Sequence, residues 1–195
     1  MSYQALVRAF SKIEELPVPV DQVLDWIREN TDHKQIDLHP VTRKRKAFRG
    51  AFRRMGVPTG AMYSHDFDIR TQVLFGEDLA PDWKRLVIVK EALHVFDPQG
   101  ARIDTPDGVR KLIPAIITSE LLNAAAFAPA INDYLGPFRA MAVLLPRAAR
   151  RKLAKARDAE TRSTSEIATY AQLPEHYVDI WLSIGDSAEF ELAGF

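Results

Sequence analysis

The stretch Trp83 to Phe96 restricts the fold more than any other part of the chain. On a helical wheel its apolar residues cover most of the circumference. These residues are Leu86, Val87, Ile88, Val89, Ala92, Leu93, Val95 and Phe96. A helix that is apolar on most sides is stable only when most sides are buried. The sequence therefore predicts a largely buried helix with other elements packed around it.

Four polar side chains lie in the second half of this apolar helix or directly after it. Lys90, His94 and Asp97 fall on one narrow stripe, and Glu91 lies beside it, because residues four apart share a helix face. Polar groups on a buried helix must find partners. We therefore expect the stripe to face a cleft, another polar element or a metal ion.

The pentapeptide Lys-Glu-Ala-Leu-His, residues 90–94, differs by one residue from the H-E-x-x-H motif of zinc peptidases. In that motif two histidines four apart bind zinc, and the glutamate is the general base. Glu91 and His94 match the base and the second ligand. Lys90 occupies the position of the first ligand, and a protonated lysine does not bind zinc. A buried helix whose His94 is simply hydrogen-bonded explains the same residues.

Composition narrows the class of protein. The chain has 195 residues, 47% of them hydrophobic, which is enough for one core, and we expect a single domain over residues 1–195. Its 26 basic residues balance 26 acidic ones, so no net charge attracts it to nucleic acid or membrane. Without cysteine, a metal site would need His, Asp or Glu. No apolar run resembles a signal peptide or a membrane span, so a cytoplasmic protein is the default expectation.

The remaining patterns predict a mostly helical α+β fold with one small sheet. Strands are expected within 61–75, where a hairpin could form, just before the apolar helix. Asp78 or Asp82 is the expected N-cap of that helix. The expected helices cover residues 3–16, 21–28, 42–55, 83–96, 105–128, 138–145, 147–155, 165–172 and 175–184. The domain then divides into a helical part (1–58), the sheet with the apolar helix (59–128) and the C-terminal helices (129–195).

Five stretches occur in an order that is similar to a known family. They are LPVPVDQVLDWI (16–27), GAMYSHDFDIRTQVLFG (60–76), KRLVIVKEALHVFD (84–97), RAMAVLLP (139–146) and STSEIATYAQLPEHYVDIWL (163–182). Together they resemble the ImmA/IrrE metallopeptidase-like family over most of the chain. The resemblance implies a zincin-like core: helices, a small sheet, the H-E-x-x-H helix, a helix with an acidic third ligand, and a C-terminal helix pair.

The chain departs from that family at the metal site. Lys90 replaces the first histidine, and Ala142 stands where an acid is often seen. Asp133 and Glu120 are the candidates for the third ligand. We therefore expect a degenerate, non-catalytic domain without a bound cofactor. In it the ammonium group of Lys90 lies near the vacated metal position and pairs with Glu91, an upstream acid or Asp133.

The resemblance also implies a role for such a domain. It suggests regulation or interaction in a bacterial or prophage setting, with an unidentified protein partner, for which a transcriptional repressor is one candidate. The first alternative is an active zinc endopeptidase with a non-standard ligand set. In it Asp97 or Asp133 would join His94 as a ligand, and Glu91 would be the base.

The second alternative is a nucleic-acid-associated regulator that uses a basic segment. The bases of this segment are Arg43, Lys44, Arg45, Lys46, Arg49, Arg53 and Arg54. Such binding would depend steeply on salt and would weaken when residues 43–46 are neutralised. Few aromatic residues lie between these bases.

The last helix presents Glu175, His176 and Asp179, which do not suit a phosphate backbone. We therefore expect this helix pair to pack rather than to bind DNA.

Overall fold

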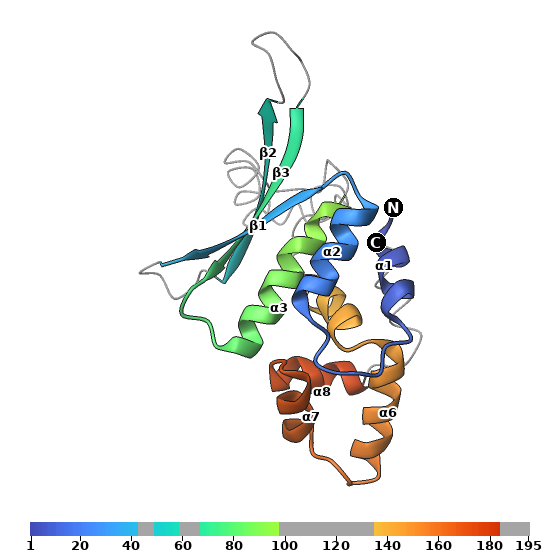
Figure 1. Ribbon diagram of the computed structural model, residues 1–195. Coiled ribbons are helices and arrows are strands. Elements are labelled where there is room, and N and C mark those ends of the chain that lie inside the picture. Colours follow the sequence, from blue (N-terminus) through green and yellow to red (C-terminus); the bar gives the residue numbers. More distant parts are fainter. Residues whose placement is uncertain (43–48, 59–66, 98–134, 184–195) are drawn as a thin grey trace, which may run out of the picture.

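Helices cover one face of a small β-sheet in the computed structural model, which describes residues 1–42, 49–58, 67–97 and 135–183 (Figure 1). Helices α1 (Tyr3–Phe10) and α2 (Val20–Asn30) precede strands β1 (Gln35–Val41), β2 (Gly50–Pro58) and β3 (Phe67–Gly76). Helix α3 (Pro81–Ala92) follows and continues as the 3-10 turn η1 (Leu93–Phe96). Residues 135–144 are helical and lead to α6 (Arg147–Asp158), α7 (Thr164–Ala171) and α8 (Glu175–Ser183). The predicted α+β class, with a small sheet and a C-terminal helix pair, is confirmed.

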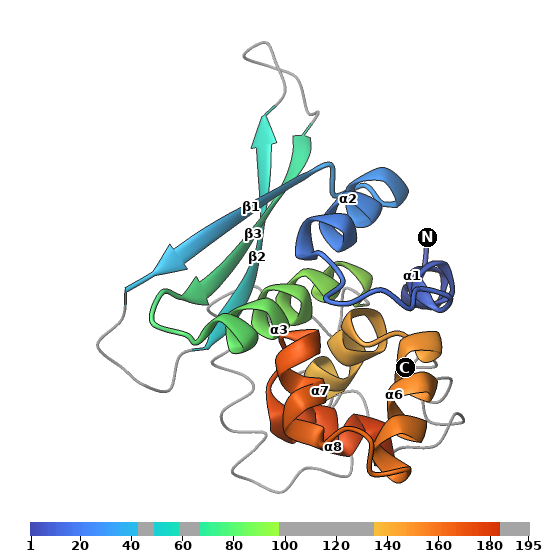
Figure 2. The same ribbon diagram turned by 60° about the horizontal axis from the view of Figure 1, so that its bottom comes forward.

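The sheet has the strand order β1-β3-β2, with β1 parallel and β2 antiparallel to the central strand β3. Helices α2 and α3 pack against this sheet, as both views show (Figures 1 and 2). Ile36, Thr71 and Val73 are buried. Pro40 is tolerated in β1 because this strand lies at the edge of the sheet, where a missing N–H leaves no ladder bond unmade.

One prediction for this region was wrong, and one strand was missed. Residues 42–55 were predicted to be a basic helix, but residues 50–58 form strand β2, and residues 43–48 lie outside the described part of the chain. Phe52 packs against the core while Arg53 is exposed, which is the two-residue alternation of a strand. Strand β1 was not predicted, because Pro40 within QIDLHPV counts against a strand in the sequence pattern. Pairing with β3 decides its structure.

The apolar helix is buried as predicted. Leu86, Val87, Ile88 and Val89 are four consecutive residues, and each is at most 7% exposed. The predicted Asp caps were wrong. The N-cap is Ala80, which makes no side-chain capping bond, and Pro81 occupies the first turn, where it needs no N–H partner. At the other end the chain tightens to a 3-10 turn, in which residues three apart lie above one another.

The C-terminal helices pack beside the beginning of α3 (Figure 2). Trp181 of α8 is fully buried, and its indole N–H donates a 3.1 Å hydrogen bond to the carbonyl of Leu145. Helix α7 begins with a capping box between Ser163 and Glu166. The predicted pair of packed helices is thus present. None of the helices in the described ranges combines the length and the apolar composition that a membrane crossing requires.

Candidate functional site

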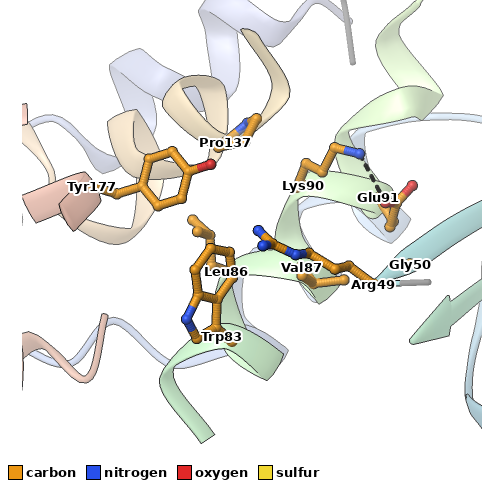
Figure 3. Close-up of a pocket in the computed structure, with 9 residues that line it drawn as sticks. All are labelled: Arg49, Gly50, Trp83, Leu86, Val87, Lys90, Glu91, Pro137 and Tyr177. Carbon is orange, nitrogen blue, oxygen red and sulfur yellow. Dashed lines mark hydrogen bonds and ion pairs between the residues drawn. The ribbon is translucent and has the colours of Figure 1, made fainter. Parts of the chain in front are cut away.

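A continuous chain of charged contacts runs along the polar stripe of α3 and η1. Lys90 Nζ lies 3.0 Å from Glu91 Oε1 (Figure 3). Glu91 Oε2 lies 3.5 Å from His94 Nε2, and His94 Nδ1 lies 2.6 Å from Asp97 Oδ2. Asp97 Oδ1 in turn lies 2.7 Å from Arg139 Nη1. We call these five residues the polar cluster.

The polar cluster is largely removed from water. The side chains of Glu91, Asp97 and Arg139 are 4%, 2% and 5% exposed, and those of Lys90 and His94 are 15% and 17% exposed. Buried charges are tolerated only when they are paired and hydrogen-bonded. Among the described residues, Lys90 and Arg139 bring two positive charges to the cluster, and Glu91 and Asp97 bring two carboxylates that face them.

Asp97 is held in its ionised form. Burial alone would raise the pKa of Asp97, but the hydrogen bond and charge of His94, with those of Arg139, lower it below its ordinary value of 3.8. An ionised carboxylate only accepts hydrogen bonds. His94 therefore donates its Nδ1–H to Asp97, and its Nε2 is the nitrogen that faces Glu91. The 3-10 turn makes this contact, because it aligns residues 94 and 97.

Arg139 completes the cluster from the helix of residues 135–144. Its guanidinium lies 4.6 Å from the centre of the Tyr3 ring, and the Tyr3 hydroxyl donates a 2.9 Å hydrogen bond to the Arg139 carbonyl. Sequence reasoning singled out Ala142 in this helix as a missing acid. Ala142 is buried, and the residue that reaches the site, three positions earlier, is a base. An arginine that begins an apolar segment was the available signal, since it must find an acid once buried.

Two glycines allow the backbone to approach α3 closely. A Cβ atom at Gly50 of β2 would lie 2.5 Å from Val87 Cγ1 and 2.8 Å from Glu91 Oε1. A Cβ atom at Gly136 would lie 2.9 Å from two side-chain carbons of Lys90. The Lys90–Glu91 pair is therefore enclosed by β2 on one side and by the 135–144 helix on the other. Neither glycine was identified from the sequence.

The described donors near His94 do not fit a zinc ion. Both oxygens of Asp97 are engaged, one by His94 and one by Arg139. The carboxylate of Glu91 faces the ammonium group of Lys90. Within the described ranges, no three His, Asp or Glu side chains converge so that they could hold a metal. Asp133 and Glu120, the candidates for a third ligand, lie outside the described residues.

The basic segment does not form one surface in the part of the chain that the structure describes. Arg49 is exposed and its guanidinium lies 4.2 Å from the centre of the Trp83 ring. Arg53 and Arg54 are consecutive residues of β2 and so point to opposite faces of the sheet. The other four bases, Arg43, Lys44, Arg45 and Lys46, lie outside the described residues. For Arg53 and Arg54, the predicted helical arrangement is thus wrong, because both lie in β2.

Comparisons with known proteins found no relative of this chain. No protein-family model, no curated protein and no solved structure matches the chain. The residue pattern of the chain and the geometry of the polar cluster are therefore the grounds for a functional proposal.

Proposed function

We propose that this chain is a degenerate metallopeptidase-like domain, similar to the ImmA/IrrE family, that works by binding a protein partner rather than by hydrolysis. In this proposal the zincin-like scaffold is retained and the polar cluster replaces the zinc centre. The observation that carries the proposal is the 3.0 Å contact between Lys90 Nζ and Glu91 Oε1. It pairs a cation at the first-ligand position with the residue that would be the general base.

The charges of the cluster support this proposal. Glu91 could act as a base toward a metal-bound water only if its carboxylate were free to accept a proton. Lys90 neutralises that carboxylate within a site where Glu91 is 4% exposed. A divalent ion added there would meet the ammonium group at close range, and like charges repel strongly in a poorly hydrated site.

The role of Asp97 weighs against the alternative of an active zinc endopeptidase. As a ligand it would have to turn an oxygen away from either His94 or Arg139. The second of these movements would leave a buried guanidinium unpaired, and removing one partner of a buried pair costs about 3–5 kcal/mol. Asp97 therefore fits better as a residue that orients His94 than as a metal ligand.

A metal-binding experiment tests the proposal. Purified wild-type protein and the variant Lys90→His are equilibrated with zinc and dialysed, and the bound metal is measured by mass spectrometry. We expect substoichiometric zinc in the wild type. We expect clear binding in Lys90→His, because two imidazoles four residues apart then share one face. Lys90→Met, which removes the cation without adding a ligand, is the matched control and should bind no zinc.

Two outcomes would overturn the proposal. One is a folded Lys90→His protein that binds no more zinc than Lys90→Met does. The other is a wild-type protein that holds stoichiometric zinc and hydrolyses peptides, with both properties lost in His94→Gln and hydrolysis alone lost in Glu91→Gln. That second pattern would establish the endopeptidase.

A further inference from the structure

A cavity of about 270 Å³ opens beside the polar cluster (Figure 3). The described residues of its walls come from separate parts of the chain. Arg49 precedes β2, Trp83 and the Lys90–Glu91 pair belong to α3, and Pro137 and Tyr177 belong to the C-terminal half. The cavity thus exists only because the fold brings these parts together.

Arg49 supplies the cavity with a cation that has no acidic partner among the described residues. Its guanidinium stacks on Trp83, 4.2 Å from the ring centre, and no carboxylate of the described residues pairs with it. Glu91, the acid among the described wall residues, is 4% exposed and already faces Lys90 at 3.0 Å. The charge that the described wall presents to a ligand is therefore positive. A planar guanidinium matches the two oxygens of a carboxylate.

Aromatic rings form another part of the cavity wall. The rings of Trp83 and Tyr177 meet edge to face with centroids 5.6 Å apart, and Phe138 supports Tyr177 in the same way at 5.7 Å. Such contacts hold the rings in fixed orientations. Leu86 and Val87 add apolar surface. A ligand that fills this space must therefore carry an apolar group next to its charge.

The volume limits the size of that ligand. Pockets for whole drug-like ligands or cofactors usually measure about 300–1,000 Å³. At about 270 Å³ the cavity falls just below this range, so it suits a group of about the size of one amino-acid residue.

We propose that this cavity is a binding site for an apolar carboxylate, with the carboxylate on Arg49 and the apolar group against Trp83 and Tyr177. Two sources offer this chemistry: a free organic acid, and the C-terminal residue of a peptide. The site does not depend on whether the chain has lost its zinc, because Arg49 and the two rings lie outside the polar cluster. The zinc experiment and the experiment below can therefore fail separately.

The test compares ligands that differ only in charge. Calorimetry measures the binding of 3-phenylpropionate and of its neutral amide, 3-phenylpropanamide, to the full-length wild-type protein. A second arm uses a short peptide that ends in phenylalanine and the same peptide with an amidated C-terminus. We expect at least one carboxylate to bind roughly tenfold or more tightly than its amide, since hydrogen bonds to charged groups are stronger by this order.

Two variants locate the binding. Arg49→Gln should abolish the preference for the carboxylate. Arg53→Gln removes an exposed arginine of the adjoining strand β2 and should leave the preference unchanged. Preference for the free acid alone identifies a small-molecule site, and preference for the peptide alone identifies a chain terminus. Either result supports the proposal.

Three results would overturn the proposed site. They are the absence of saturable binding by both carboxylates at millimolar concentration, equal affinity for acid and amide, and an unchanged preference in Arg49→Gln. Because Arg49 is exposed, its replacement is not expected to unfold the protein. A far-ultraviolet circular dichroism spectrum verifies this.

Discussion

Asp97 and Arg139 form a 2.7 Å ion pair across 42 positions of the sequence, and their side chains are 2% and 5% exposed. The pair joins the end of η1 to the helix of residues 135–144. Through Tyr3, which contacts Arg139 by both its ring and its hydroxyl, it also reaches the first helix. One buried pair thus connects three segments that are far apart in the chain.

The variant Arg139→Met should destabilise the protein strongly. Removing one member of a buried ion pair leaves the other charge without compensation, which typically costs about 3–5 kcal/mol. The double variant Asp97→Asn/Arg139→Met removes both charges and should recover part of this loss. Urea denaturation followed by circular dichroism measures the free energy of unfolding.

The exposed Arg53 provides the control for this measurement. Arg53→Met should change the free energy of unfolding by no more than about 0.5 kcal/mol, as surface substitutions usually do. If Arg139→Met costs as little as Arg53→Met, the pair has no structural role.

The contribution of Asp97 to stability should disappear in acid. Because the folded state holds the pKa of Asp97 below 3.8 through His94 and Arg139, against the opposing effect of burial, the unfolded chain takes up the proton first as the pH falls. The stabilisation is complete above the unfolded pKa and is lost as the pH falls through the lower, folded pKa. The stability difference between wild type and Asp97→Asn should therefore shrink as the pH falls below about 4.

Other acids do not disturb this comparison. The hydrogen bond from Arg70 lowers the pKa of Asp37, and the backbone N–H of Ser163 lowers that of Glu166. Both groups are present in the wild type and in the variant, so their effects cancel in the difference. A difference that grows on acidification would show that the sign of the shift at Asp97 is wrong.

The two glycines that enclose α3 should respond differently to alanine. In Gly50→Ala the new Cβ would lie 2.5 Å from Val87 Cγ1, in a packed part of the core, and overpacking costs about 1–3 kcal/mol. In Gly136→Ala the Cβ meets the flexible side chain of Lys90. That side chain can move, and alanine favours a helix by about 1 kcal/mol over glycine. Thermal unfolding should therefore show a clearly lower Tm for Gly50→Ala than for Gly136→Ala, and the reverse order would contradict the close approach of β2.

Local patterns were sufficient for the long helices. The apolar residues of the stretch 83–96 predicted a buried helix, and its core positions are buried as expected. The C-terminal pair was also predicted, because the turn at Leu173-Pro174 separates two helical patterns. Strands β1 and β2 were not predicted. Pro40 interrupts the strand pattern of β1, and both strands gain their structure from pairing with β3.

For the site, the sequence determined which polar groups share one stripe of the apolar helix, since helical geometry alone places Lys90, His94 and Asp97 together. It also determined that these groups need partners. Only the tertiary structure decided that Arg139 forms an ion pair with Asp97 and that two glycines let the backbone approach the Lys90–Glu91 pair. It also decided that Arg49, Trp83 and Tyr177 line one cavity. The physical reason is the distance along the sequence over which each interaction acts. A helix face is set by neighbours three and four residues apart, whereas a buried charge can pair with any opposite charge that packing brings within hydrogen-bonding distance.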